Sequence, residues 1–305
     1  MNKSLAALKA KNTLASLDIV IPTYNDSHLL ERCIDSILNQ SIAPNIIFVI
    51  DDGSKNNEAE KVSKLKKFSN LTIKFYKIKN GGPSRARNFG FSQSTSKHIL
   101  FLDADDCLEV GAIESYNEKI SLLKNTSFGI FGRIEFNDKN CRRRTPQIYF
   151  NKIDKNQIGR KNLFEVHISS IMFVRSFFEE VDGFNESLTH NEDFDLILRL
   201  MKRGEFESLP NITLRKNFRD GSQSNKDYVY SYYGVRKFLL IAQEKNLLSE
   251  DEIIVRNKEN LLSYGKNVFL NFEFKAAKEI FNNAFANIGP KNLKEYACFI
   301  LSKVL

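Results

Sequence analysis

Short apolar runs alternate with longer amphipathic stretches between residues 17 and 106. The runs are rich in β-branched and aromatic residues and cover 18–21, 46–50, 71–78 and 99–102. Runs of this kind are typical of strands buried on both faces, and their alternation with helical stretches is typical of βαβ units. Between the first two runs, apolar residues recur at helical spacing after Asp26 or Ser27 as the N-cap. The sequence therefore predicts an α/β fold with a mostly parallel central sheet flanked by helices.

The remainder of the chain is first mixed and then helical. In the middle we predict a helix near 110–123, strands at 127–136 and 168–174, a polar loop at 139–144, and a helix that begins near residue 192. After about residue 226 the apolar residues follow helical spacing, and Gly289-Pro290 marks a stop before a last helix. We therefore predict a tail or short helix at 1–16, an α/β domain at 17–225 and a C-terminal helical region at 226–305.

Composition excludes several classes of protein. Apolar residues make up 42% of the chain and the formal net charge is +8, which argues against a disordered chain, a collagen-like repeat or a membrane bundle. The cysteines lie far apart without metal-ligand spacing, so neither a zinc site nor a disulfide framework is expected. The longest apolar runs fall far below the roughly 20 residues that span a bilayer. We expect a reducing, cytoplasmic location, with the cytoplasmic face of the plasma membrane as a second option.

Three carboxylates follow a buried strand, at Asp103, Asp105 and Asp106. In an extended chain, side chains two positions apart point the same way, so we expect Asp103 and Asp105 to converge. Like charges at that spacing repel unless a cation lies between them, and Mg²⁺ or Mn²⁺ suits carboxylates and phosphates. The alternative is a polar turn in which Asp106 caps the next helix, and the motif alone leaves both open.

Two further strand ends are polar, at 22–26 and 51–54. Each taken singly is a turn, but the carboxyl ends of parallel strands meet at one edge of a sheet, where open α/β sheets bind ligands. A glycine-rich turn at 80–82 then precedes Arg85 and Arg87 at the start of a helix. Backbone N–H groups and guanidinium groups suit phosphate. Together these segments predict a ligand-binding crevice.

These motifs carry a resemblance to a known family. The chain resembles family 2 of the inverting glycosyltransferases, which have the GT-A fold of the nucleotide-diphospho-sugar transferases. The matching segments, in order along the chain, are 19–25, 49–54, 80–90, 102–106, 180–186 and 191–200. The resemblance covers about residues 17–225, and the helices that follow lie outside it.

The resemblance implies a role for each matching residue. A nucleotide-sugar donor would be bound by Pro22, Thr23, Tyr24, Asn25, Asp51, Asp52, Arg85 and Asp103. Asp103 and Asp105 correspond to the family's D-x-D motif and would hold Mn²⁺ or Mg²⁺ on the donor diphosphate. Asp193 matches the aspartate of the Glu-Asp motif, which is the catalytic base. The chemistry agrees, because a sugar hydroxyl needs a carboxylate to take its proton, and a helix N-terminus keeps such a group ionised. The alternative for Asp193 is a charge that only stabilises the helix.

Three residues receive auxiliary or acceptor roles: His190, Glu192 and Arg219. Many family members carry a histidine at the position of Arg219 that can complete the metal site, and here the arginine could neutralise the diphosphate instead. The remaining histidines, His167 among them, are interpreted as structural. The Gln-x-x-Arg-Trp motif of processive members is absent from the sequence, which contains no tryptophan, so we expect one transfer per encounter.

The sequence thus predicts an inverting, metal-dependent glycosyltransferase with a UDP-linked donor. Its acceptor would be a saccharide or lipid-linked glycan in the synthesis of a bacterial surface polysaccharide. The C-terminal helices would form a core, a homo-oligomer face or a peripheral contact with the inner membrane. One alternative is a sugar nucleotidyltransferase, although residues 22–28 lack the glycine and lysine of a triphosphate loop. The other is a non-catalytic basic binding or scaffold protein, but the basic residues are scattered and predict no nucleic-acid partner.

Overall fold

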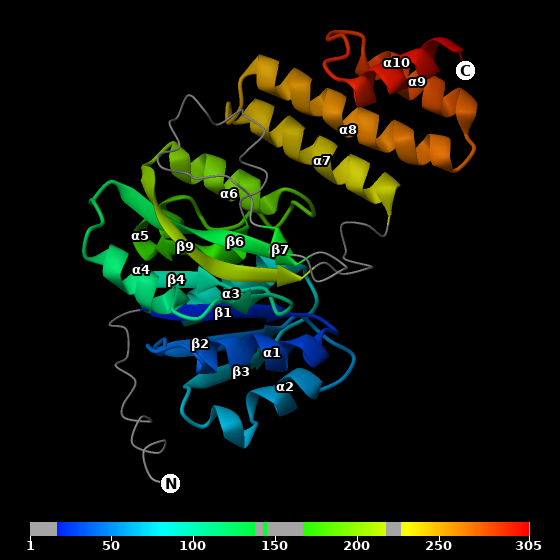
Figure 1. Ribbon diagram of the computed structural model, residues 1–305. Coiled ribbons are helices and arrows are strands. Elements are labelled where there is room, and N and C mark those ends of the chain that lie inside the picture. Colours follow the sequence, from blue (N-terminus) through cyan, green and yellow to red (C-terminus); the bar gives the residue numbers. More distant parts are fainter. Residues whose placement is uncertain (1–16, 138–142, 145–166, 218–226, 305) are drawn as a thin grey trace. The chain divides into compact units, whose positions relative to one another are not determined.

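One mixed sheet forms the centre of the α/β region (Figure 1). A computed structural model describes residues 17–137, 143–144, 167–217 and 227–304. The strands are β1 (Leu17–Thr23), β2 (Ile46–Asp51), β3 (Ile73–Lys77), β4 (His98–Phe101), β5 (Cys107–Leu108), β6 (Ser127–Asn137), β7 (Arg143–Arg144), β8 (Ile171–Val174) and β9 (Glu205–Asn217). Their order in the sheet is β3-β2-β1-β4-β8-β6-β9-β5, and β7 pairs with β6. Strands β3, β2, β1 and β4 are parallel, which confirms the predicted fold class.

Helices cover both faces of this sheet because its strands are apolar on both sides. In β1, Ile19 and Ile21 belong to one hydrophobic cluster and Val20 to the other, as the period of two requires. The first cluster includes residues of α1 (Ser27–Leu38), α2 (Glu58–Ser63) and α4 (Ala112–Ile120). The second includes residues of α3 (Pro83–Gln93), α5 (Arg175–Glu180) and α6 (Glu192–Met201). The parallel strands therefore lie between two layers of helix.

Three local predictions need correction. Residues 168–170 form a 3-10 helix, and β8 begins only at Ile171. Arg143 and Arg144 pair with the end of β6, although they were predicted in a loop whose other residues lie outside the described part. Strand β9 was not predicted from the sequence. Its Pro210 argues against a strand, but the proline falls where the register between β6 and β9 shifts, so the pairing continues on either side.

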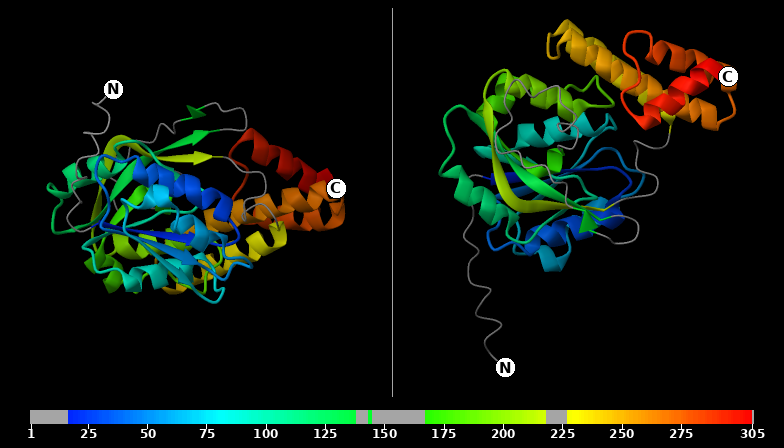
Figure 2. Two further views of the ribbon diagram at one scale, coloured as in Figure 1. Left: turned by 90° about the horizontal axis from the view of Figure 1, so that it is seen from below. Right: turned by 45° about the horizontal axis from the view of Figure 1, so that its top comes forward.

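Four helices make up the described C-terminal region (Figure 2). They are α7 (Tyr228–Glu244), α8 (Glu250–Leu270), α9 (Phe274–Ala284) and α10 (Leu293–Val304). A separate core joins α8, α9 and α10, and Phe281 at its centre is fully buried. No helix in the described ranges is both long and apolar enough to span a membrane.

The packing of the chain defines two compact units. The first comprises residues 1–186 and 196–219, and the second comprises 187–195 and 220–305. The second unit thus contains the C-terminal helices together with a short segment that precedes and begins α6. The predicted domain limits at 16 and 225 stay predictions.

A capping box starts α8 at Ser249. The Ser249 hydroxyl accepts the N–H of Glu252 at 3.3 Å, and the Glu252 carboxylate accepts the N–H of Ser249 at 2.8 Å. We expect Ser249→Ala to lower the free energy of unfolding by about 1 kcal/mol, because it removes this cap. Ser263→Ala, at an exposed position inside the same helix, should be neutral or slightly stabilising. The free energy of unfolding is measured by urea titration. An equal decrease in both variants would contradict the role of the cap.

Candidate active site

The ends of β1 and β2 are joined by their own polar groups. Thr23 and Asp51 are register partners, and both are buried. The Asp51 carboxylate accepts the N–H of Ser54 at 2.8 Å, and the Ser54 hydroxyl in turn accepts the N–H of Asn25 at 2.8 Å. The Lys77 ammonium lies 3.9 Å from the second oxygen of Asp51. These bonds fix the two polar strand ends side by side, as the parallel pairing predicted.

Asp52 fastens the glycine-rich turn to the end of β2. One of its oxygens accepts the N–H of Gly81 at 2.9 Å and the other accepts the N–H of Gly82 at 2.8 Å. Burial raises the pKa of Asp52, and these two N–H groups partly oppose the shift. Gly53 has φ +79°, and a Cβ there would lie 2.8 Å from the Asn80 nitrogen, so the turn requires glycine at this position.

The other predicted donor residues are placed by the same two segments. Pro22 is buried in β1, whereas Tyr24 and Asn25 are exposed just beyond it. Arg85 is exposed near the start of α3, but Arg87, two residues further along the helix, is buried. Contacts of these residues with a donor stay predictions.

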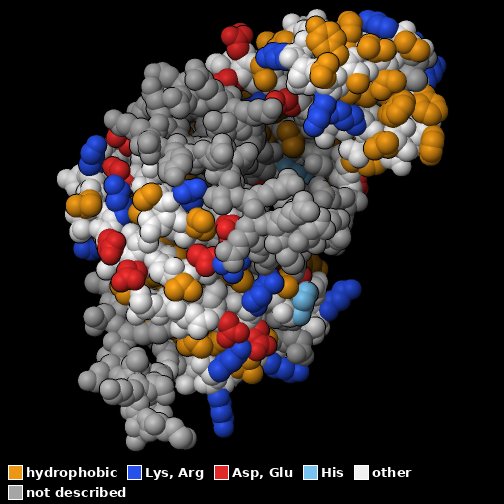
Figure 3. Space-filling model, viewed as in Figure 1, with side chains coloured by type: hydrophobic (Ala, Val, Ile, Leu, Met, Phe, Trp, Pro, Cys, Tyr) orange, Lys and Arg blue, Asp and Glu red, His pale blue; other side chains and the backbone are white. Residues whose placement is uncertain are grey.

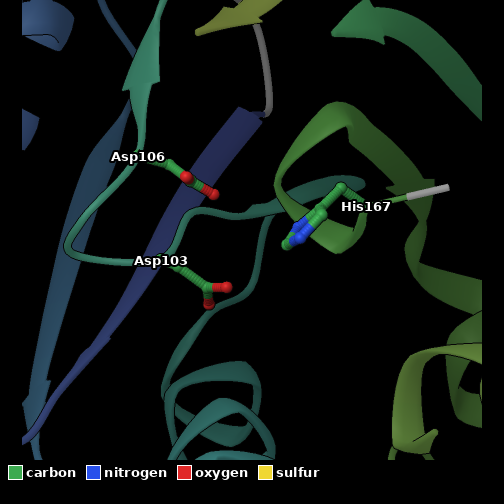
Figure 4. Close-up of side chains that lie close together, drawn as sticks. All are labelled: Asp103, Asp106 and His167. Carbon is green, nitrogen blue, oxygen red and sulfur yellow. The ribbon is translucent and has the colours of Figure 1, made fainter. Parts of the chain in front are cut away.

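The acidic motif after β4 forms a turn. The N–H of Asp106 donates to the carbonyl of Asp103 at 3.0 Å, so the expectation of an extended chain is wrong. A β-turn brings positions i and i+3 together. Asp103 and Asp106 therefore lie close together, and both side chains point toward His167 (Figure 4). Their ligand atoms lie within 4.8 Å of one another, the one such group of three or more found in the described residues. Asp105 is not among the three, and its role as a metal ligand stays a prediction.

Two cations already lie at this acidic cluster, which we define as Asp103, Asp106 and His167. The Arg87 guanidinium donates to Asp103 at 2.8 Å, and the Lys216 ammonium lies 3.7 Å from Asp106. Lys216 also donates to Nε2 of His167. Two carboxylates thus face two positively charged side chains.

The pKa values in the acidic cluster are shifted in different directions. Burial by itself raises the pKa of Asp103, but the charges of Arg87 and then Lys216 outweigh it and lower that pKa to about 2. Burial raises the pKa of Asp106 to about 7 in spite of Lys216. Burial, followed by the charge of Lys216, lowers the pKa of His167 to about 4. At neutral pH the histidine is therefore uncharged, which is the form that ligates a metal.

The acidic cluster fits a divalent cation by its chemistry. Its two carboxylates and one neutral imidazole are ligand types that Mn²⁺ accepts. The carboxylate of Asp106 is fully buried, and the Lys216 ammonium lies 3.7 Å from one of its oxygens, where a cation would compete with it. Neither the place of His167 beside the two carboxylates, a histidine interpreted above as structural, nor that of the cationic partner Lys216 was predicted from the sequence. Both are brought to Asp103 by long-range packing, for which the sequence offers no local signal.

Asp193 lies in the first turn of α6. Asn191 precedes the helix with φ +60°, a conformation that asparagine tolerates, and its carbonyl accepts the N–H of Asp195 at 2.9 Å. Glu192 and Asp195 share this turn, where the helix dipole stabilises negative charge. His190 is partly buried, which lowers its pKa. Arg219 lies outside the described residues.

Comparison with known proteins decides the family. The model of "Glycosyl transferase family 2" matches residues 18–181, more than half of the chain. The chain belongs to this family. The prediction of a glycosyltransferase, made from the strand-end motifs, is thereby confirmed.

Family 2 relatives include enzymes of polysaccharide synthesis. The hyaluronan synthase of Pasteurella multocida is 27% identical over 77% of this chain, and the match covers 24% of that protein. The poly(ribitol-phosphate) β-N-acetylglucosaminyltransferase TarP of Staphylococcus aureus is 28% identical over 55% of this chain and 50% of that protein. The chain spans only about a quarter to a third of the first curated relatives that it matches.

A solved structure confirms the GT-A fold. The crystal structure of S. aureus TarS 1–349 in complex with UDP-GlcNAc has a TM-score of 0.63 against this chain, at 16% identity. The alignment covers 94% of this chain and 88% of the TarS chain, so the likeness includes the C-terminal helices.

Removal of Lys216 should tighten cation binding at the acidic cluster. A unit charge about 4 Å from a bound divalent ion costs about 2 kcal/mol even at the dielectric constant of water. We expect Lys216→Met to raise the affinity for Mn²⁺ at least about tenfold, as measured by isothermal titration calorimetry. Lys124→Met removes the same charge from an exposed position elsewhere and should leave the affinity unchanged. An unchanged affinity in Lys216→Met would show that Mn²⁺ binds elsewhere.

Proposed function

We propose that this family 2 glycosyltransferase is inverting and metal-dependent, and that it transfers a sugar from a UDP-linked donor. The acceptor is a hydroxyl of a saccharide or lipid-linked glycan in the synthesis of a bacterial surface polysaccharide. The observation that carries this proposal is the single sheet edge that gathers Asp51, Asp52 and the acidic cluster at the carboxyl ends of parallel strands. The names of the relatives support the acceptor class, and the UDP-GlcNAc complex of TarS supports the donor class.

The residues of the chain divide the work of the reaction. The strand ends with Thr23 and Asp51 bind the nucleotide. The turn fastened by Asp52 leads into α3, where Arg85 approaches the diphosphate. Asp193 takes the proton of the acceptor hydroxyl as that oxygen attacks the anomeric carbon, which inverts the configuration there. A divalent cation held by the acidic cluster would neutralise charge on the departing diphosphate.

The proposal extends to the surroundings of the enzyme. Figure 3 shows apolar side chains gathered on the C-terminal helices, and Phe272, Leu293 and Val304 are among those most exposed. This surface supports the predicted contact with a membrane or a second copy of the chain. A cytoplasmic location next to the inner membrane would bring the enzyme to a lipid-linked acceptor.

UDP binding tests the donor half of the proposal. We expect calorimetry to detect UDP binding that becomes stronger when Mn²⁺ is added, because the cation screens two carboxylates from the diphosphate. UMP should gain far less from Mn²⁺, since it lacks the second phosphate. Absence of UDP binding with and without the metal would refute the donor assignment.

The base assignment predicts a selective loss of transfer. Asp193→Asn should fold and bind UDP like the wild type but lose about 10²- to 10⁴-fold in the rate of transfer, the contribution of a general base. The control is Asp182→Asn, at an exposed position whose φ of +58° asparagine tolerates. The rate of transfer is measured by the release of UDP. If Asp193→Asn turns over as fast as this control, Asp193 is not the base.

A further inference from the structure

The segment that carries Asp193 packs against the C-terminal helices. We name residues 187–195 the base loop, and they belong with residues 220–305 to the second compact unit. All contacts described next lie inside that unit. They come chiefly from one helix, α7, which begins well after the α/β region that the family model matches.

The closest approach between α7 and the base loop is at Gly234. A Cβ at this position would lie 2.3 Å from Nδ1 and 2.8 Å from Cγ of His190, and 3.1 Å from the hydroxyl of Thr189. Glycine destabilises a helix interior by about 1 kcal/mol relative to alanine. Its presence in the middle of α7 is explained by the space that the His190 ring occupies.

Two further residues of α7 hold the base loop on either side of this point. The Lys237 ammonium donates to the carbonyl of Ser187. The Phe238 ring lies 5.6 Å from the ring of Phe194, and both side chains are buried. Phe194 is adjacent to Asp193, so the position of its ring constrains the backbone that carries the carboxylate.

The contacts with the base loop lie on one face of α7. Positions 230, 234, 237 and 238 follow the i, i+4, i+7, i+8 spacing of a single helical stripe. The Tyr230 ring on this stripe lies 5.3 Å from that of His190. Arg236 lies on the opposite side, where it lines a cavity of about 390 Å³ together with residues of α8. The two faces of α7 are therefore separable by mutation.

We propose that α7 is a positioning element for the catalytic base: Gly234, Lys237 and Phe238 set the orientation of the base loop and thereby of the Asp193 carboxylate. The inference rests on the proposed role of Asp193. A base must stand within hydrogen-bond reach of the hydroxyl that it deprotonates, and a displacement of about 1 Å can cost about 100-fold in rate. Gly234, Lys237 and Phe238 thus contribute to catalysis through the base loop and do not contact the substrate themselves.

Gly234→Ala in the full chain is the first test. The added methyl group would collide with His190 and shift the base loop, although alanine favours the helix itself. We expect a fall of roughly 10- to 100-fold in kcat, with the donor KM and the affinity for UDP unchanged. Hydrogen exchange of peptides from 187–195 should become faster, whereas exchange in β1 and β2 stays the same, and the melting temperature should not fall.

A double-mutant cycle with His190→Ala separates this collision from other effects. Removal of the ring frees the space, so Gly234→Ala should have little further effect on exchange of the base loop in the His190→Ala background. The exchange readout needs no activity and remains valid even where His190 contributes to acceptor binding. An equal effect of Gly234→Ala in both backgrounds would overturn the proposal.

Lys237→Met is a second variant, matched by Arg236→Met one residue away. Both lose one positive charge from α7, but only Lys237 lies on the stripe that holds the base loop. We expect Lys237→Met to lower kcat and speed exchange in 187–195, and Arg236→Met to leave both unchanged. Wild-type rates in both Gly234→Ala and Lys237→Met would refute the positioning role. Full activity of Asp193→Asn would instead refute the proposed base, and the exchange measurements would then still report whether α7 orders the loop.

Discussion

The parallel pairing of β1 with its two neighbours is the constraint on which the site depends. Because β2 and β4 both run parallel to β1, three carboxyl ends meet at one edge of the sheet. Burial of these strands on both faces fixes their register, since a slip by one residue would turn apolar side chains toward the wrong layer of helices. Because the strands themselves are apolar on both faces, the polar residues gather where the strands end.

The sequence was sufficient to predict the sheet edge and its motifs but not the geometry of the acidic cluster. Asp51, Asp52 and Asp103 could be placed because strand periodicity and parallel pairing are local, regular properties. The turn between Asp103 and Asp106 instead depends on a single backbone hydrogen bond, which the pattern of aspartates does not specify. His167 and Lys216 join the cluster through a 3-10 helix and a strand that periodicity failed to predict.

In the helical region, too, the sequence predicted the elements but not their contacts. Its helices were predictable because apolar residues recur at helical spacing, yet this spacing does not reveal which other residues each position of α7 contacts. Gly234 was unremarkable in the sequence, and only its distance to His190 gives it a meaning. Glycine has no side chain whose chemistry could indicate a role. The role of Gly234 becomes visible only when the structure shows which segment of the same chain packs against it.

The charges at the acidic cluster bear on how this part of the chain reaches its folded state. In many metal sites the ligands repel one another until the ion arrives, and folding then waits for the metal. Here Arg87 and Lys216 supply two positive charges to Asp103 and Asp106 from within the same chain. The sheet edge can therefore form without a supply of divalent cation, so folding of this part of the chain does not wait for a metal.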